Sequence, residues 1–199
     1  MFITSIIATA AIGAAGLQSP TTLSCPITLQ PVVKGSKITD WNGVRFTYCC
    51  PGCDSQFEKD PRAALEKAAK AGKAVGLFLF DPISKKPIDS AKAKGGFSDY
   101  KGVRYFFDSG DEKTAFDKEP SKFGALPTKE ALFCPVSKER VETYAKASGY
   151  GDFEGVRYYY CCAGCETPFE KEPAKYAPAA KDYVRLPKAT TTAPKGGGQ

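Results

Sequence analysis

The order of apolar and polar positions repeats three times along the chain. Each copy begins with a short apolar stretch that ends in Cys-Pro or Asp-Pro. A polar segment then leads to a Gly-Val-Arg-aromatic run, and the copy closes with a Phe and an acidic-Pro pair. The copies span residues 23–72, 79–124 and 132–180, and are called repeats 1, 2 and 3 below. Internal repetition of this kind predicts three small units rather than one large core.

Each repeat carries signals for both strands and helices. The apolar run 77–80 predicts a short strand, and the aromatic run 155–160, which follows a glycine turn, predicts another. A helix is expected directly afterwards, with Thr167 as its N-cap and Glu170 completing a capping box. The same device is expected at Ser55 with Glu58 and at Thr114 with Asp117, and a second helix at 62–70. A short hairpin or strand pair followed by a short capped helix predicts the α+β fold class.

Aromatic side chains alternate along the predicted strands. Their spacing predicts that they point inward and form the core of each unit rather than a stacking platform for a ligand. Trp41 takes the position that Tyr100 and Phe153 hold in the other repeats, so we expect it to be structural. The alternating aromatics are Phe46, Tyr48, Tyr105, Phe107, Tyr158 and Tyr160.

The two ends of the chain differ from the repeats. Residues 1–19 are uncharged and mostly small or apolar, which predicts a secretory signal peptide and therefore a secreted or periplasmic protein. No Lys or Arg precedes this apolar run, so a retained N-terminal anchor is the alternative. After signal cleavage, no membrane span is expected. Residues 190–199, which include three consecutive glycines, predict a flexible tail.

Composition excludes several kinds of chemistry. The chain has no histidine, which rules out a Ser-His-Asp triad, a Cys-His pair, an imidazole proton shuttle and a mixed Cys/His zinc finger. Its net charge of +6 comes from Lys and Arg spread among acidic residues. We interpret these charges as solvated surface and expect no nucleic-acid partner. Units of roughly 50 residues need cross-links such as disulfides or metal sites to be stable, and the eight cysteines are the obvious candidates to form them.

The cysteines of repeats 1 and 3 have the spacing of a thiolate metal site. Two of them lie four positions apart across a Gly-containing turn, just before a predicted helix start that favours the thiolate, and a third arrives from the neighbouring strand. Three or four sulfur ligands suit Zn(II) or Cu(I), the cofactors that we expect. The expected ligands are Cys25, Cys49 and Cys53 in repeat 1 and Cys134, Cys161 and Cys165 in repeat 3, with Cys50 and Cys162 as candidate fourth ligands.

Repeat 2 has carboxylates where the outer repeats have cysteines. Asp81, Asp108 and Glu112 occupy the three corresponding positions. Their oxygen atoms would suit a hard cation such as Ca(II), Mg(II) or Mn(II). The alternative, which we favour, is a degenerate repeat kept as a spacer, with its carboxylates solvated.

Together these motifs resemble the YHS and TRASH-like metal-binding domains. The resemblance rests on the upstream Cys-Pro-hydrophobic motif, the aromatic strand that ends in Cys-Cys-x-x-Cys, the Phe four residues further on and the acidic-Pro pair. It covers almost all of the chain that follows the predicted signal peptide, and it is strongest in repeat 3. It implies three tandem treble-clef-like units that bind, sense or transport heavy metals, especially copper. The family's three cysteines fall on the two ligand sets named above, and repeat 2 departs from the pattern at all three positions.

We therefore expect a non-enzymatic, exported metal-binding protein that captures, buffers or delivers a metal ion. The main alternative is a disulfide-stapled extracytoplasmic interaction module without metal, whose aromatic faces and Lys-rich surface bind a protein partner. In that alternative, Cys50 would pair with Cys53, or Cys25 with Cys49. The C-x-x-C pairs also match, weakly, the pattern of a thiol oxidoreductase.

Overall fold

The computed structural model describes residues 22–32 and 37–192. These residues form a mixed α+β fold with six α-helices, a six-stranded sheet, a three-stranded sheet and a two-stranded ribbon. The α+β class expected from the sequence is confirmed. The predicted signal peptide and residues 193–199 lie outside the described residues. Within the described part of the chain, no helix combines the length and the apolar character needed to cross a membrane.

Repeats 1 and 2 build one sheet together. Repeat 1 supplies β1 (Ile38–Trp41), β2 (Val44–Thr47), α1 (Cys53–Phe57) and α2 (Pro61–Lys70), and repeat 2 with the residues just before it supplies β3 (Gly76–Phe78), β4 (Gly96–Tyr100), β5 (Val103–Phe107), α3 (Gly110–Lys118) and α4 (Pro120–Phe123). Strand β11 (Thr190–Thr192), near the C-terminus, completes a sheet with the order β11-β1-β2-β3-β5-β4. Because β2 pairs with β3 and β3 pairs with β5, the sheet continues across the boundary between the two repeats.

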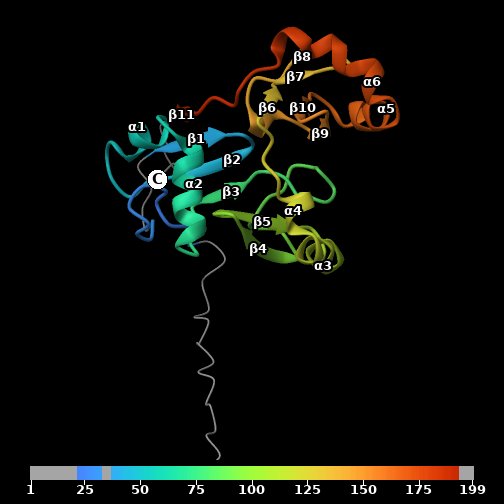
Figure 1. The fold of residues 1–199 in the computed structure, drawn as a ribbon. Coiled ribbons are helices and arrows are strands. Elements are labelled where there is room, and N and C mark those ends of the chain that lie inside the picture. Colours follow the sequence, from blue (N-terminus) through green and yellow to red (C-terminus); the bar gives the residue numbers. More distant parts are fainter. Residues whose placement is uncertain (1–21, 33–36, 193–199) are drawn as a thin grey trace, which may run out of the picture.

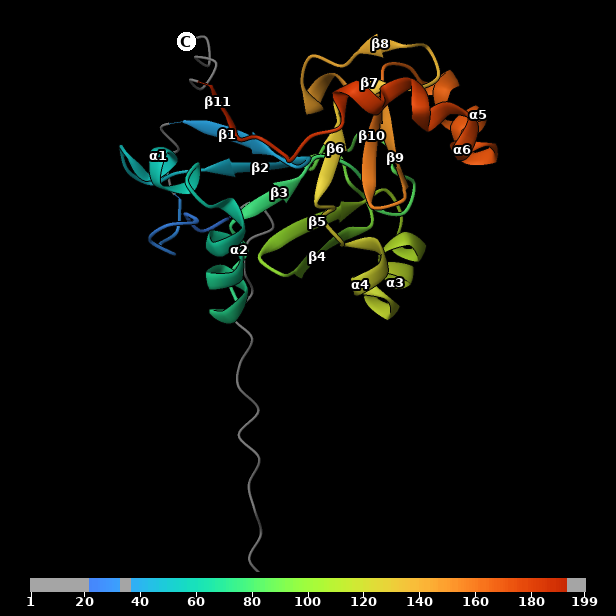
Figure 2. The same cartoon turned by 45° about the horizontal axis from the view of Figure 1, so that its top comes forward.

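Repeat 3 and the residues next to it form a second lobe, drawn in yellow to orange-red in Figures 1 and 2. Its elements are β6 (Lys129–Ala131), which lies just before repeat 3, β7 (Phe133–Cys134), β8 (Glu139–Arg140), β9 (Gly149–Phe153), β10 (Val156–Tyr160), α5 (Glu166–Lys171) and α6 (Pro173–Tyr176), with 3₁₀ segments at Tyr144–Lys146, Ala163–Cys165 and Ala177–Tyr183. The three-stranded sheet has the order β6-β10-β9, and β7 pairs with β8 in a separate ribbon. The strand predicted at 155–160 is confirmed as β10.

The core is aromatic, as the sequence predicts. The six alternating aromatic side chains and Trp41 are all buried, with at most 5% of each residue exposed. One apolar cluster runs through repeats 1 and 2 and includes Tyr144, Tyr150 and Tyr159 of repeat 3, whereas a second cluster lies within repeat 3. Repeats 1 and 2 thus share a core as well as a sheet, and the division of the chain into three units stays a prediction.

An Arg–Asp pair joins the two strands of the hairpin in every repeat. In repeat 3, Nε and Nη2 of Arg157 donate to the two carboxylate oxygens of Asp152, each at 2.8 Å. Arg45 with Asp40 and Arg104 with Asp99 form the same two bonds. The Arg104 and Arg157 side chains are only 1% and 2% exposed. The interpretation of the basic residues as solvated surface is therefore wrong for these two, whose charge is balanced by a two-bond partner.

Several helices begin earlier than the sequence predicts. The expected N-caps Ser55, Thr114 and Thr167 all lie inside helices, in α1, α3 and α5. The N-cap of α3 is instead Ser109, whose hydroxyl accepts from the Glu112 N–H while the Glu112 carboxylate accepts from the Ser109 N–H. The three predicted capping boxes are wrong, because the turn after each hairpin already starts the helix. The second helix of repeat 1, predicted at 62–70, is confirmed as α2.

The C-terminal segment returns to repeat 1. Thr190–Thr192 form β11, which pairs antiparallel with β1 at the edge of the large sheet. Nε1 of Trp41 donates to the Pro187 carbonyl at 3.1 Å, and the Thr191 hydroxyl donates to the Glu58 carboxylate. The predicted flexible tail is wrong for these three threonines, because consecutive β-branched residues suit an edge strand.

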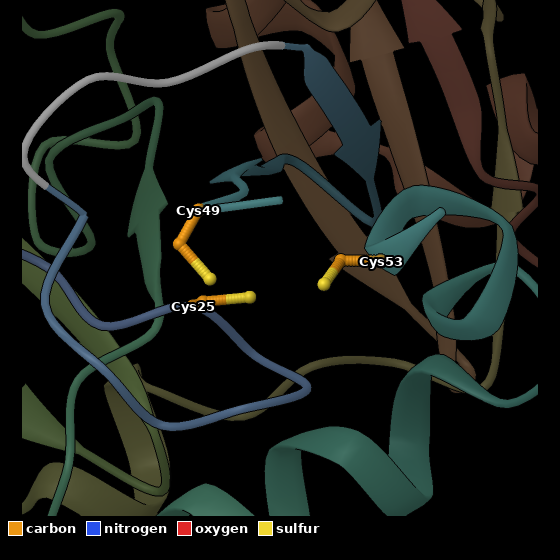
Figure 3. A group of neighbouring side chains, drawn as sticks. All are labelled: Cys25, Cys49 and Cys53. Atoms are coloured by element: carbon orange, nitrogen blue, oxygen red, sulfur yellow. The ribbon is translucent and has the colours of Figure 1, made fainter. Parts of the chain in front are cut away.

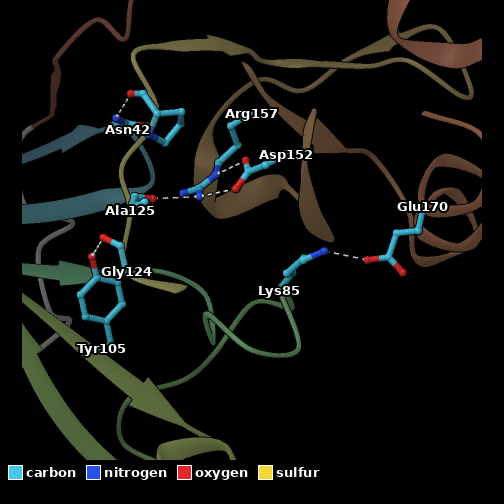
Figure 4. A network of polar contacts seen from close by, with 9 residues as sticks. Asn42, Lys85, Tyr105, Gly124, Ala125, Asp152, Arg157 and Glu170 are labelled. Carbon is cyan, nitrogen blue, oxygen red and sulfur yellow. Dashed lines mark hydrogen bonds and ion pairs between the residues drawn. The ribbon is translucent and has the colours of Figure 1, made fainter. Parts of the chain in front are cut away.

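The linker between repeats 2 and 3 is held by side chains from all three repeats (Figure 4). The side chains of Asn42, Tyr105 and Arg157 donate hydrogen bonds of 2.9, 2.9 and 3.2 Å to the carbonyls of Pro127, Gly124 and Ala125, respectively. One donor comes from each repeat, so the linker fixes the two lobes against each other.

Candidate metal centres

A turn of the same shape opens each repeat, at residues 25–29, 81–85 and 134–138. In each turn the N–H of the fifth residue donates to the carbonyl of the first, at 2.8 to 2.9 Å. The fifth residue is never glycine, yet its φ lies between 59° and 61° in all three copies. This left-handed conformation is uncommon for such residues, so its recurrence shows that the three turns are built in the same way. The first residue of the turn is Cys, Asp and Cys in repeats 1, 2 and 3.

In repeat 1, three sulfur atoms meet from three separate segments (Figure 3). Cys25 begins the turn, Cys49 follows β2, and Cys53 is the first residue of α1. Their Sγ atoms all lie within 4.8 Å of one another. Cys25 and Cys53 are buried, whereas Cys49 is exposed, so the group of sulfur atoms is open to solvent on one side.

Repeat 3 brings together the corresponding three cysteines. Cys134 lies in β7 at the start of the turn, Cys161 follows β10, and Cys165 is the N-cap of α5. Their Sγ atoms also lie within 4.8 Å of one another. Among the described residues, these two cysteine triads are the groups of His, Cys, Asp or Glu side chains that meet this limit. A metal ion could therefore be held at either triad, and the donor atoms would be sulfur alone.

The first cysteine of each triad has a lowered pKa. Burial opposes ionisation of Cys25, but the N–H groups of Thr28 and Cys49 donate toward its sulfur, and the net effect is a pKa below the ordinary value. Burial of Cys134 is likewise outweighed, mainly by the hydroxyl and N–H of Ser137, so its pKa is also lowered. The buried turn thus stabilises one thiolate in each triad before any metal is present.

The other two thiols of repeat 3 hold their protons more tightly. Burial raises the pKa of Cys161 to about 11, and burial with hydrogen bonds to Cys162 and Cys134 raises the pKa of Cys165 well above its ordinary value. The expectation that the helix start lowers the pKa of Cys165 is wrong, because burial and neighbouring sulfur atoms outweigh the helix dipole. Metal binding at this triad would therefore release protons.

Two hydroxyl groups lie beside the triads and were not predicted from the sequence. Oγ1 of Thr28 lies 3.2 Å from Sγ of Cys49, and Oγ of Ser137 lies 3.0 Å from Sγ of Cys161. Each hydroxyl residue is the fourth of its turn, and Ser84 holds that position in repeat 2. A Ser or Thr three positions after every Cys-Pro or Asp-Pro start is the sequence signal that would have identified them.

The candidate fourth ligands lie outside the triads. Cys50 forms a disulfide with Cys53, whereas Cys162 and Cys165 are unbonded, with their sulfur atoms 3.2 Å apart. Neither Cys50 nor Cys162 belongs to a group whose members all lie within 4.8 Å. A sulfur in a disulfide is not a thiolate, so the triad of repeat 1 offers three thiolate ligands only when its disulfide is reduced.

In repeat 2, Asp81 takes the place of the first cysteine and is fully buried. Its carboxylate oxygens accept from the N–H groups of Ile83, Ser84 and Asp108 at 2.7, 3.2 and 3.0 Å. Burial nevertheless raises the pKa of Asp81, against the effect of these three donors. The expectation that the carboxylates of repeat 2 are solvated is therefore wrong for Asp81, whose hydrogen bonds come from two N–H groups of the turn and one that follows β5.

The three carboxylates of repeat 2 do not form a cation site in this structure. Asp81, Asp108 and Glu112 are not among the groups whose ligand atoms lie within 4.8 Å of one another. Asp108 is exposed, and the Glu112 carboxylate accepts from the N–H and the hydroxyl of Ser109 in the capping box.

Comparison of the chain with protein-family models, with curated proteins and with solved structures gave no match. The two cysteine triads and their surroundings are therefore the features that bear on the function.

Proposed function

We propose that each triad binds one soft or borderline metal ion, Zn(II) or Cu(I), through its thiolates, and that the protein captures, buffers or delivers this metal rather than catalysing a reaction. The observation that carries the proposal is the meeting of three sulfur atoms, twice, in corresponding positions of two repeats. Three sulfur donors without oxygen or nitrogen suit Cu(I) in a trigonal site, or Zn(II) with one further ligand.

The groups around the triads support the proposal. Hydrogen bonds to metal-bound sulfur orient the ligands and stabilise their negative charge. The N–H groups directed at Cys25 and Cys134, and the hydroxyls beside Cys49 and Cys161, are placed to act in this way. Exposed Cys49 in repeat 1 and partly exposed Cys161 in repeat 3 offer a route for metal to enter and leave, as capture or delivery requires.

The proposal extends to the family and the location of the protein. The order of a turn that presents the first cysteine, a hairpin that ends near the second and a helix start that carries the third supports assigning treble-clef-like units of the YHS and TRASH-like kind. The resemblance in sequence motifs favours the same assignment. The apolar residues 1–19 favour export, and with it a secreted or periplasmic site of action.

The experiment that tests the proposal is a metal count on the reduced protein. We expect about two equivalents of zinc or copper by plasma mass spectrometry, one for each triad. Thiol titration should show that the triad cysteines become reactive only after the metal is removed. Cys25→Ser and Cys134→Ser should each lose one equivalent, while the matched control Asp108→Asn should lose none. Binding that survives loss of both Cys25 and Cys134 would contradict the assignment.

A second candidate function is favoured by one observation, the Cys50–Cys53 disulfide. In this reading the cysteines are staples of an extracytoplasmic interaction module, and a protein partner binds its surface. The same titration separates the two candidates. The disulfide reading expects no metal in the reduced protein, and no free thiols in protein isolated without reductant.

A further inference from the structure

The C-x-x-C pair exists in two states within this one chain. In repeat 1, Cys50 and Cys53 are joined by a disulfide. In repeat 3, the corresponding Cys162 and Cys165 remain thiols, although their sulfur atoms lie only 3.2 Å apart. The two repeats otherwise present their triads in the same way. The same local fold therefore accommodates both the oxidised and the reduced form of this pair.

One member of each pair is also a member of a triad. Cys53 and Cys165 supply the third sulfur of the two triads, whereas Cys50 and Cys162 belong to neither. A disulfide at the pair removes a thiolate from the triad and leaves two. Oxidation of the pair and metal binding by the triad therefore compete for the same sulfur atom.

The two cysteines of each pair differ in their exposure to solvent. Cys162 is exposed and Cys50 is partly exposed, whereas Cys53 and Cys165 are buried. A disulfide arriving from solvent can reach the first cysteine of the pair but not the second. The first is the attacking thiol, and the second is the one that resolves the mixed disulfide.

The turn between the two cysteines has room to change shape. Gly52 has a φ of +84° in the oxidised turn, whereas Gly164 is not left-handed and lies in the 3₁₀ segment of the reduced turn. A Cβ placed on either glycine would meet no atom within 4 Å. Glycine accepts both conformations at little cost, and no neighbouring atom obstructs the difference.

We propose that the C-x-x-C pair of each outer repeat is a thiol–disulfide exchange site for low-molecular-weight disulfides of the glutathione type, and that its oxidation releases metal from the adjoining triad. This inference rests on the proposed metal binding. It assigns Cys50 and Cys162 a role in redox control of the triads, in place of a role as fourth ligands.

The exchange balances in two steps. The thiolate of Cys162 attacks one sulfur of glutathione disulfide, the bond between the two glutathione sulfurs breaks, and one glutathione thiolate leaves. The sulfur of Cys165 then attacks the Cys162 sulfur of the mixed disulfide, the Cys162–Cys165 bond forms, and the second glutathione thiolate leaves. Two electrons pass from the protein to the glutathione disulfide, and one glutathione thiolate takes up the proton that the Cys162 thiol loses. With metal bound, the Cys165 sulfur would give up its bond to the metal instead of a proton, and the metal would leave. Cys50 and Cys53 react in the same way in repeat 1.

The test uses the full chain, reduced and loaded with Zn(II), and then exposed to glutathione disulfide. We expect zinc release, followed with a chromogenic zinc indicator, in step with Cys50–Cys53 and Cys162–Cys165 disulfides identified by peptide mass spectrometry. The double variant Cys50→Ser/Cys162→Ser keeps all six triad cysteines. Its zinc release should slow by on the order of tenfold or more. Each single variant should protect only its own repeat.

The outcomes separate this inference from the proposed function. If the reduced protein binds no zinc, the proposed function falls, and the inference falls with it. If zinc binds but glutathione disulfide leaves it in place, or the double variant releases it as fast as the unchanged protein, only the redox inference is overturned. If the reduced double variant has lost its zinc affinity, Cys50 and Cys162 are ligands, and the inference is again overturned.

Discussion

Repeats 2 and 3 begin with the same turn, but the side chain that accepts its hydrogen bonds is a carboxylate in repeat 2 and a sulfur in repeat 3. In repeat 2, the N–H groups of Ile83 and Ser84 in the turn and of Asp108 after β5 donate to the carboxylate of Asp81, and a capping box begins the following helix. In repeat 3, the corresponding groups face the sulfur of Cys134, and α5 has no side-chain cap. Repeat 2 is thus satisfied by its own residues, whereas the sulfur atoms of repeat 3 can still bind a metal or form a disulfide. The comparison indicates that the turn requires a buried group that accepts hydrogen bonds from its N–H groups, either a carboxylate or a sulfur. Metal binding would be a separate property of the triad that the turn itself does not require.

Metal removal should give the largest difference between the two repeats. A ligand present at about a thousand times its dissociation constant stabilises the folded state by about 4 kcal/mol. In the Cys25→Ser variant, whose repeat 1 triad is already incomplete, chelation of the reduced, metal-loaded protein should therefore lower amide-exchange protection in β9 and β10 by up to that amount, and change β4 and β5 much less. Native-state hydrogen exchange with mass spectrometry measures both at once. An equal loss of amide-exchange protection in β5 and β10 would contradict this difference between repeats 2 and 3.

Asp81→Ala should destabilise the protein by about 3 kcal/mol, because it removes a fully buried acceptor and leaves three N–H groups without their partner. Asp108→Ala is the matched control, since Asp108 is exposed and its backbone N–H is retained. It should change stability by less than about 0.5 kcal/mol. Urea unfolding of both variants gives the two values. Equal effects would mean that the carboxylate of Asp81 has no special role in the turn.

Glu130 should give a smaller, pH-dependent effect. This carboxylate of repeat 3 is fully buried and accepts from a single hydroxyl, that of Tyr144, at 2.7 and 2.9 Å. Burial raises its pKa to about 7, so the folded protein binds this proton more tightly than the unfolded chain does. Its contribution to stability is therefore greatest below its ordinary pKa and is lost as the pH rises to about 7.

The loss should amount to about 2 kcal/mol between pH 5 and 7. Glu130→Gln should remove it, because the amide still accepts from Tyr144 but does not ionise. Urea unfolding from pH 5 to 8 compares the two proteins, and any contribution from the raised pKa of Asp81 cancels in their difference. Identical pH profiles would show that Glu130 is not the group that titrates.

Local sequence patterns predicted single strands and helices better than they predicted which strands pair with each other. The strand at 155–160, the helix at 62–70 and the buried aromatics follow from spacing within a few residues. The pairing of β2 with β3 does not, because it joins two repeats across the helices α1 and α2. A shared sheet has no signature within either repeat, so the sequence suggested separate cores.

The grouping of the cysteines into two triads follows from the sequence and agrees with the structure, whereas their role as metal ligands stays a prediction and the expected pKa of Cys165 was wrong. Spacing alone brought together the cysteines of each triad, because the second and third cysteines flank one short turn. In repeat 3, the lowered pKa belongs to Cys134 instead of the helix-start Cys165, and the pKa of Cys25 in repeat 1 is also lowered, since backbone N–H groups have no sequence pattern. Asp81 was expected in solvent for the same reason. Its donors are three main-chain groups, and only the folded turn reveals them.

Strand β11 places the last described residues of the chain on the first repeat. β1 forms its outer hydrogen bonds only with Thr190–Thr192, after the chain has passed through both other repeats. During synthesis, the lobe of repeats 1 and 2 therefore keeps an open strand edge until the segment that follows repeat 3 has been made. Such an edge can pair with another chain, so a ribosome that stalls in repeat 3 would leave a nascent chain open to aggregation.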